Sequence, residues 1–422
     1  MKSRSKNRPS AKTELGRRSR KEWIARGVLA SGLLVLGFLG TMNSLSQAVA
    51  KADAESAHTL ASGDGVILAQ LAEDVFSRAP DTAPDSRPAR LAKAALLADP
   101  TAVKALTILA FQAQLRGDVE QSNRLFSYST RLSRRELRPR IWAIEDAVTR
   151  GDIAGALRNY DIALRTSRNA ESVLFPTLAA AMAEPRIRAE LLKVLSTEPG
   201  WKDKFVTFAA NSGIEPEGTI ALLDEGRKIG LKATEELKVN LVNALVSQGK
   251  PDEAWTFYRT FRTAAQRNQS RDANFTLQTE YRSVFDWRAG DDLRIASAFL
   301  REGEDGLLDI SVPPTVAGVL ASQQQILPPG TYRLEGQSAG IQQPERSQPY
   351  WTLACQGGED LGRVRVPESN QNGGHFSGQF TVPHGCKLQT LSLVAQSTDD
   401  IMGVTGQIKR VQLTPVQREQ SN

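Results

Sequence analysis

The stretch that decides the fold is Arg116–Arg134, "RGDVEQSNRLFSYSTRLSR", because the chain nearly repeats it as "RGDIAGALRNYDIALRTSR" at Arg150–Arg168. The two glycines, Gly117 and Gly151, are 34 residues apart, which is the period of a helix–turn–helix repeat. Glycine readily adopts the left-handed backbone conformation that a turn between antiparallel helices requires. The repeat therefore predicts helical hairpins, and a hairpin turn explains the RGD tripeptide better than cell adhesion does.

The residues that follow each glycine fit the second helix of such a hairpin. Asp118 and Asp152 stand where a helix needs an N-cap. Small and aromatic residues then recur at spacings of four and three, which places them along one helix face. They are Ser122, Phe126 and Ser129 in the first copy and Ala156, Tyr160 and Ala163 in the second. Small side chains let the paired helix approach closely, and the ring fills the groove beside them.

This pattern resembles the tetratricopeptide repeat over residues of about 85–265. The matching positions are Gly151, Ala156, Tyr160 and Ala163, then Gly249, Ala254 and Tyr258, with Ala95 and Pro100 from an earlier copy. The proline that closes a repeat is replaced by Arg134 and Arg168 in the two central copies. The resemblance implies a stack of hairpins whose curved surface binds a protein or peptide.

Arginine is concentrated in the same region. Residues 115–168 contain eleven arginines and seven acidic residues but no lysine. Because the guanidinium group can bind a carboxylate through two hydrogen bonds, these arginines are candidates for contacts with an envelope protein or peptide. The candidates are Arg124, Arg131, Arg158 and Arg165. The alternative is an ordinary solvated helix face.

The N-terminus has the composition of a membrane-targeting segment. Residues 1–26 hold ten Lys and Arg residues against two Glu, whereas the rest of the chain is slightly acidic. The high isoelectric point therefore describes a tail, and no nucleic-acid partner is predicted. Gly27–Met42, "GVLASGLLVLGFLGTM", has no charge, and the uncharged run continues to Ala50. A membrane span needs roughly 20 such residues.

The positive flank should remain in the cytoplasm, so residues after about 50 are predicted to lie on the periplasmic or extracytoplasmic side of the inner (cytoplasmic) membrane. Residues 27–47 are interpreted as an uncleaved anchor. The alternative is a signal peptide that is cleaved after "AVA" at Ala48–Ala50. Both interpretations export the body of the chain.

The last third of the chain changes to short alternating runs separated by Gly and Pro, such as "LLDISVPP", "YWTLACQGG" and "GHFSGQFTVPHG". Period two with this turn spacing predicts an antiparallel β-sandwich over residues 284–416. In "CKLQTLSLVAQ", Leu388 is out of step with Leu391 and Leu393, which suggests a bulge there.

The two cysteines of the chain, Cys355 and Cys386, both lie in this region. In an exported protein they are expected to form a disulfide, which would stabilise the fold by roughly 3–4 kcal/mol on the loop-entropy model. Two free buried thiols are the alternative. The bond is expected to join the halves of the sandwich and to leave the helical array nearly independent.

The order of these strands resembles the jelly-roll modules of carbohydrate-binding type, on the motifs "VFDWRAGDDL", "QQQILPPGTYRL", "WTLAC" and "GQIKRVQL". The resemblance implies a glycan-binding face on which aromatic rings stack against sugar C–H surfaces. The candidates are Trp287, Tyr332, Tyr350, Trp351 and Phe376. The alternative is that several of them belong to the core.

No sequence motif supports catalysis, a metal site or a cofactor, and the chain is predicted not to be an enzyme. "GQSAG" at Gly336–Gly340 fits a nucleophile elbow, but "IQQPERSQP" follows it and cannot form the required helix. His375, His384 and Cys386 lack the compact spacing of a zinc site. The Asp pairs at 291–292 and 399–400 could hold a structural Ca²⁺, although turn caps are the simpler interpretation.

The predicted fold class is multidomain, α then β: a transmembrane helix, an α-solenoid of helical hairpins and an antiparallel jelly-roll sandwich. The predicted segments are a basic tail (1–26), the anchor (27–47), a linker with a first helix (48–84), the repeats (85–265), a second linker (266–283), the sandwich (284–416) and a tail (417–422). Together they predict a membrane-anchored envelope scaffold or adaptor, accessory to surface polysaccharide assembly or export. The alternatives are a glycan-processing hydrolase with a divergent site in the sandwich and a purely protein-binding assembly factor.

Overall fold

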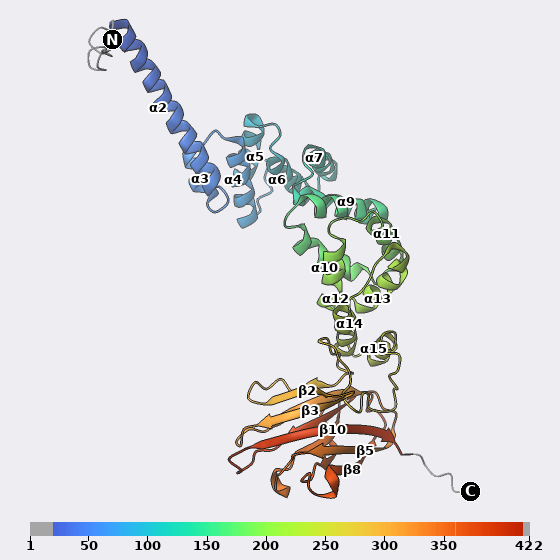
Figure 1. Cartoon of the computed structure of the whole chain (residues 1–422). Coiled ribbons are helices and arrows are strands. Elements are labelled where there is room, and N and C mark those ends of the chain that lie inside the picture. Colours follow the sequence, from blue (N-terminus) through green and yellow to red (C-terminus); the bar gives the residue numbers. More distant parts are fainter. Residues whose placement is uncertain (1–19, 359, 417–422) are drawn as a thin grey trace, which may run out of the picture. The chain divides into compact units, whose positions relative to one another are not determined.

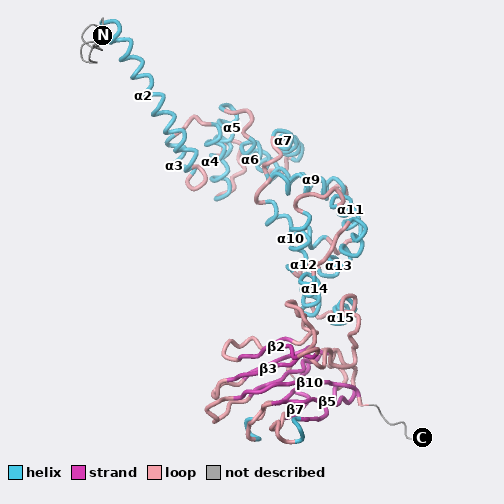
Figure 2. Tube along the Cα trace, viewed as in Figure 1, coloured by secondary structure: helices cyan, strands magenta, loops and turns pink. Residues whose placement is uncertain are grey.

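The computed structural model describes residues 20–358 and 360–416. Most of the predicted basic tail and all of the predicted 417–422 tail lie outside these residues. The chain forms two compact units that divide between Leu174 and Phe175. The α-helices precede the strands along the chain, and the strands form two antiparallel sheets, so the predicted fold class is confirmed (Figures 1 and 2).

The N-terminal unit is helical. Its helices are α2 (Arg20–Val49), α3 (Ala54–Leu60), α4 (Gly65–Arg78), α5 (Arg87–Ala98), α6 (Val103–Leu115), α7 (Val119–Leu132), α8 (Leu137–Thr149) and α9 (Ile153–Thr166), and α10 (Ala170–Ala181) crosses into the second unit. With 30 residues, α2 is long and apolar enough to cross a membrane. At its end Ser46 and Ala50 are buried, and Ala50 shares a small core with Ala57 and Ile67.

The repeated stretch forms the predicted hairpins. Gly117 and Gly151 have φ values of +81° and +71°, in the left-handed region that favours glycine. Asp118 accepts a hydrogen bond from the backbone N of Gln121 at 3.0 Å, and Asp152 caps α9 in the same way. The small and aromatic positions of both copies are buried, and the Phe126 ring packs between Phe111 and Trp142. The predicted turn glycines, N-caps and buried helix face are therefore confirmed.

The second unit begins with further helices and ends with the sandwich. The helices are α11 (Pro185–Leu195), α12 (Lys202–Ser212), α13 (Pro216–Glu225), the 3₁₀ helix η1 (Gly226–Ile229), α14 (Glu235–Ser247) and α15 (Pro251–Tyr258). Gly249 joins α14 to α15 with a φ of +75°. This last hairpin repeats the turn geometry of the hairpins in the first unit.

The sandwich has the strand order of a jelly roll. Its strands are β1 (Arg288–Ala289), β2 (Ala296–Glu302), β3 (Asp305–Val312), β4 (Gly318–Gln325), β5 (Gly330–Ala339), β6 (Tyr350–Cys355), β7 (Asp360–Arg365), β8 (His375–Val382), β9 (Gln389–Ala395) and β10 (Val404–Pro415). Sheet A has the order β1-β4-β9-β6-β7, and sheet B has the order β2-β3-β10-β5-β8. From β3 to β10 the chain therefore crosses between the sheets as two Greek keys do.

The segment between α15 and β1 is part of the sandwich. Ser270 donates a backbone hydrogen bond to Leu413 at 2.9 Å, and Val411 donates one to Ala273 at 3.0 Å. These residues of β10 lie beyond its pairing with β3, which ends at Ile408. Residues 270–273 thus run beside β10 where β3 has ended, and they continue sheet B.

A second core joins the last helices to the end of the sandwich. It contains Val242 and Leu245 from α14, Trp255 and Tyr258 from α15, and Phe285, Ile326 and Leu388. Leu388 is out of step with Leu391 because the two side chains enter different cores. The suggested bulge at Leu388 is wrong: the register irregularity beside β9 lies in β4, between Val319 and Ala321. The disulfide was expected to leave the helical array nearly independent of it, but α14 and α15 share this core with Leu388, two residues after Cys386.

Candidate binding site on the sandwich

The aromatic residues that the sequence offered for glycan binding are mostly in the core. Trp287 and Trp351 are fully buried, with ring centroids 5.5 Å apart in an edge-to-face arrangement. Tyr332 is buried, its hydroxyl donates to the backbone O of Pro328 at 2.8 Å, and burial raises its pKa. In this structure the three rings therefore offer no open face for a sugar.

Tyr350 and Phe376 have different surroundings. Tyr350 is half-buried on β6, and the guanidinium of Arg363 lies 4.7 Å from its ring centroid. Phe376 is buried on β8 opposite Gly336 of β5. A Cβ at Gly336 would come within 2.2 Å of the Phe376 ring, so glycine makes room for this ring beneath the sheet. Phe376 supports a hollow on the outer face of sheet B and also contributes to its lining.

This hollow, which we call the sheet-B hollow, has a volume of about 640 Å³. It lies over β5, β8 and β10, and its polar lining is Glu335, Gln337, Asn372, His375, Ser377, Arg410, Gln412 and Thr414. The volume falls within the range of about 300–1,000 Å³ that is typical of ligand sites.

Strand register arranges six of these side chains in two rows. Arg410 pairs with Gln337, which pairs with His375; Gln412 pairs with Glu335, which pairs with Ser377. The residues between them along each strand are buried, so all six side chains lie on the outer face. Adjacent strands and alternate residues give the grid dimensions of about 10 Å by about 7 Å. It presents a carboxylate, two amides, a hydroxyl, an imidazole and a guanidinium to solvent.

Few of these groups are committed to partners within the protein. Among the described residues, Glu335 forms only an exposed ion pair with Arg333 at 3.5 Å, which contributes little to stability. The Gln337 amide donates to the backbone O of Gly373 at 3.2 Å, and the Gln412 amide donates to the backbone O of Ser270 at 3.0 Å. Neither of these hydrogen bonds uses the carbonyl oxygen of the amide, which is a hydrogen-bond acceptor.

A second hollow of about 510 Å³, which we call the junction cleft, lies where the segment after α15 meets the sandwich. Its lining includes Arg262, Arg271 and Asp286, together with Gln323 from β4 and Gln412 from β10. Gln412 thus lines both hollows. Sequence reasoning missed this cleft because residues 266–283 have the composition of a linker. The available signal was the out-of-step Leu388, which faces the helices.

Asp286 lies at the base of the cleft. Its Oδ1 accepts a hydrogen bond from the Tyr258 hydroxyl at 2.7 Å, and its Oδ2 accepts from the backbone N and hydroxyl of Ser283. Burial, followed by the negative charge of Asp286, raises the pKa of Tyr258 well above its usual value. Arg262 places its Nε 3.8 Å from Asp286 and also binds Glu235 at the start of α14. The hydrogen bond from Arg262 is the main reason why the pKa of Glu235 is lowered.

Arg271 is a buried charged residue at the end of the sandwich core. Its guanidinium donates to the backbone O of Phe285 at 2.9 Å and to Gln325 at 3.1 Å. The side chain of Gln323 bonds to the backbone N and O of Arg271, both at 3.0 Å. Burial lowers the pKa of Arg271 to about 10. These contacts explain why "QQQ" in β4 has buried glutamines in a sandwich core.

The four arginines proposed as partner contacts lie on α7 and α9. Arg124 pairs with Glu120 at 2.7 Å, Arg165 with Asp161 at 2.7 Å and Arg158 with Asp152 at 3.7 Å. All three pairs are within one helix or its cap, and their arginines are largely exposed. Arg131, at the end of α7, is also exposed. The arrangement matches a solvated helix face and leaves the guanidinium groups accessible.

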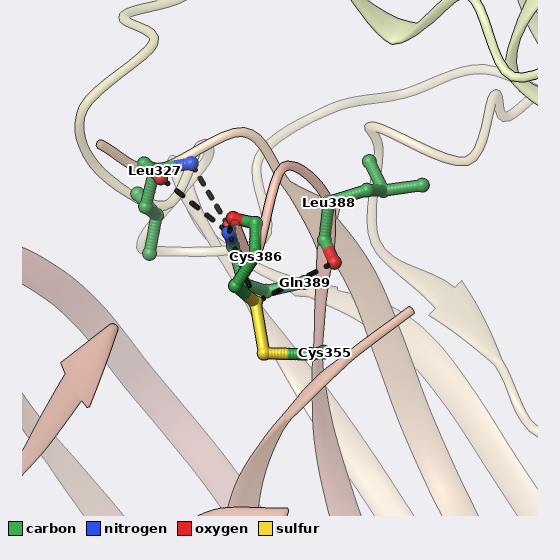
Figure 3. Close-up of a disulfide and its surroundings, with 5 residues drawn as sticks. All are labelled: Leu327, Cys355, Cys386, Leu388 and Gln389. Carbon is green, nitrogen blue, oxygen red and sulfur yellow. Dashed lines mark hydrogen bonds between the residues drawn. A yellow bond between two sulfur atoms is a disulfide. The ribbon is translucent and has the colours of Figure 1, made fainter. Parts of the chain in front are cut away.

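The predicted disulfide is confirmed. Cys355 at the end of β6 is bonded to Cys386, and their Cα atoms are 5.6 Å apart. Gln389, which is fully buried, accepts from the backbone N of Leu327 at 2.9 Å and donates to the backbone O of Cys386 (Figure 3). The preceding residue, Leu388, packs in the core shared with α14 and α15. The disulfide therefore lies one short loop away from the helical contact.

The other residues that the sequence offered as catalytic or metal-binding candidates do not lie together. Ser338 is buried within β5, where its hydroxyl contacts the Ser369 hydroxyl at 2.9 Å, so it is not on an elbow. Asp292 and Asp400 cap turns: they accept from the backbone N of Arg294 and of Met402, each at 3.0 Å. Within the described residues, no group of three or more His, Cys, Asp or Glu side chains is arranged to hold a metal ion.

No protein-family model and no curated protein matches this sequence. Among solved structures, the enzymatically active domain of tailspike protein 4 from bacteriophage CBA120 matches at 15% identity over 32% of this chain and 20% of that chain, with a TM-score of 0.24. TmCBM61, in complex with β-1,4-galactotriose, matches at 14% identity over 31% and 88%, with a TM-score of 0.23. BtGH115A, a 4-O-methyl-α-glucuronidase, matches at 12% identity over 85% and 42%, with a TM-score of 0.20.

The prediction that the chain is not an enzyme is contradicted by these matches, because two of the three structures belong to enzymes. This chain spans only a fifth of the tailspike domain. At these TM-scores the matches assign neither an activity nor a ligand to this chain.

Proposed function

We propose that this protein is a membrane-anchored envelope protein that binds a glycan on the outer face of sheet B. The observation that carries the proposal is the sheet-B hollow, in which three adjacent strands present two rows of polar side chains over a buried ring. Sugar hydroxyls are both donors and acceptors, and a site for them needs carboxylate, amide and guanidinium groups at fixed positions. A sheet fixes such positions because strand register sets their spacing.

The anchor is proposed to be α2, uncleaved, with the N-terminus in the cytoplasm and the body on the periplasmic side. Cleavage after Ala50 would remove Ser46 and Ala50, which are buried against the helices that follow. Gln47 also donates to Asp64, the N-cap of α4, at 3.3 Å. The disulfide supports an oxidising compartment. Mass spectrometry of the mature protein should find residues 20–50 retained, and a chain that begins at Lys51 would contradict the anchor.

The helical hairpins are proposed to be related to tetratricopeptide repeats and to hold a partner protein. Their matching turn geometry supports this relationship. The side chains of Leu97, Val119 and Val148 on these helices are apolar and exposed, and the partner protein is proposed to cover them. An anchored glycan binder with a docking array would suit a scaffold in the assembly or export of a surface polysaccharide.

A glycan array probed with the full-length protein in detergent tests the central proposal. Wild-type protein should bind a subset of oligosaccharides, and Glu335→Ala with Arg410→Ala should abolish the signal. Gln379→Ala is the matched control, because Gln379 is exposed on β8 but outside the hollow. Binding that survives the double substitution would contradict the site. Shortened oligosaccharides would favour the hydrolase alternative, and no glycan signal would favour the purely protein-binding one.

A further inference from the structure

We propose that the sheet-B hollow and the junction cleft form one continuous binding track for an extended, uncharged glycan segment. The inference rests on the proposed glycan binding by sheet B and adds the length and charge class of the ligand. It also assigns a binding role to the segment between α15 and β1.

The two hollows meet at Gln412. This residue lines both of them, and its amide nitrogen donates to the backbone O of Ser270, at the start of the cleft, at 3.0 Å. Ser270 is buried, and its hydroxyl accepts a hydrogen bond from the backbone N of Leu413 at 2.7 Å. The rim between the hollows is therefore a fixed polar bridge on the sheet. A ligand that lies along the grid reaches the cleft as it passes Gln412.

The charges in the cleft are already balanced within the protein. Arg271 donates to carbonyl groups of Phe285 and Gln325. Asp286 accepts from Tyr258 and Ser283, and Arg262 faces both Asp286 and Glu235.

Asp272, the other acidic residue of the cleft, accepts from the backbone N and hydroxyl of Thr276, at 2.6 and 2.8 Å. The lining thus contains two arginines, Arg262 and Arg271, and two carboxylates, Asp272 and Asp286. An anionic ligand group would have to compete with these internal partners and lose hydration in doing so.

The remaining lining suits hydroxyl groups. Besides the buried Gln323, whose amide is bonded to the backbone of Arg271, four glutamines contribute to the cleft: Gln266, Gln269, Gln278 and Gln412. Each amide carries a donor and an acceptor, as a sugar hydroxyl does. A neutral oligosaccharide long enough to cover both hollows would therefore gain contacts that a short one, confined to sheet B, would not.

Calorimetry on the full-length protein in detergent tests this inference with trisaccharides and hexasaccharides from β-1,4-galactan, cellulose and mannan, and with oligogalacturonates of the same lengths. Wild-type protein should bind a neutral hexasaccharide about tenfold more tightly than the trisaccharide, the effect of one or two additional net hydrogen bonds. Ala264→Trp should remove this difference and leave trisaccharide affinity unchanged, because Ala264 is exposed and lines only the cleft. Ala296→Trp, at an exposed site on β2 outside both hollows, should change neither affinity.

The Gln266→Ala variant gives a second measurement if the tryptophan perturbs folding, since Gln266 is also exposed and lines the cleft. It should weaken hexasaccharide binding about threefold, without effect on the trisaccharide. Equal wild-type affinities for the two lengths, equal losses in the Ala264→Trp variant, or tighter binding of oligogalacturonates would overturn the track. In those cases trisaccharide binding on sheet B would still stand, whereas no binding of any oligosaccharide would reject the proposed function itself.

Discussion

The hydroxyl of Tyr258, at the end of α15, donates a 2.7 Å hydrogen bond to the buried carboxylate of Asp286, just before β1. Tyr258 occupies the aromatic position of the last hairpin, and Asp286 lies in the turn immediately before β1. Around this bond, α14, α15 and the end of the sandwich share one apolar core. The last repeat-like hairpin is thus built into the β-domain.

Tyr258→Phe should destabilise the second unit by about 1–3 kcal/mol, because it leaves a buried carboxylate oxygen without its donor. Chemical denaturation with fluorescence detection measures this change. Tyr128→Phe is the control, because Tyr128 is exposed on α7 and its loss should cost less than about 0.5 kcal/mol. Equal stability of Tyr258→Phe and wild type would mean that the hydrogen bond has no net value.

Alkaline pH should weaken the same junction. The folded-state pKa of Tyr258 is raised above its ordinary value of 10.0, so the folded state opposes loss of this proton. The stabilisation is fully present below pH 10 and is lost as the pH rises above it, because the unfolded chain then binds fewer protons than the folded one. Denaturation curves between pH 8 and pH 11 should show a steeper loss in wild type than in Tyr258→Phe. Parallel slopes would contradict the assignment.

Ala156→Arg should destabilise the N-terminal unit by several kcal/mol. Ala156 is buried on the face of α9 that packs within its hairpin, and a larger charged side chain there combines overpacking with charge burial. Arg158→Ala is the matched control two residues away, since its 3.7 Å ion pair is exposed and contributes at most about 1 kcal/mol. An unchanged melting temperature for Ala156→Arg would show that the hairpin face is wrongly assigned.

Cys355→Ser should lower the stability of the sandwich by roughly 3–4 kcal/mol on the loop-entropy model. The effect should extend to α14 and α15, because Leu388 links the loop of Cys386 to their core. Hydrogen exchange should therefore increase in both elements, while α6–α9 of the first unit keep wild-type protection. Confinement of the change to the strands would contradict the shared core.

The hairpins could be predicted from the sequence because their signals are local. A glycine at φ near +75°, an N-cap aspartate and a small–aromatic–small face all lie within about one helix of each other. The sandwich and its disulfide followed from alternation and from the presence of two cysteines. The sandwich depends on the periodicity of the sequence, and two cysteines allow a single disulfide pairing.

The candidate binding site could not be predicted in the same way. Tryptophan is a typical residue of sugar-binding faces, but the rings of Trp287 and Trp351 face inward. Tertiary packing decides this orientation, and the local sequence does not show it. The grid on sheet B depends on the register of β5 with both β8 and β10, which are distant in sequence. The junction cleft depends on a segment that looks like a linker until Arg271 enters the sandwich core.

Hydrogen–deuterium exchange on the full-length protein, with and without a bound neutral hexasaccharide from the array, tests the central claim most directly. The account predicts slower exchange in β5, β8, β10 and residues 262–286, with no change in α4–α9. Protection confined to the helices of the first unit, or to the β6–β7 edge around Tyr350, would contradict a glycan site on sheet B.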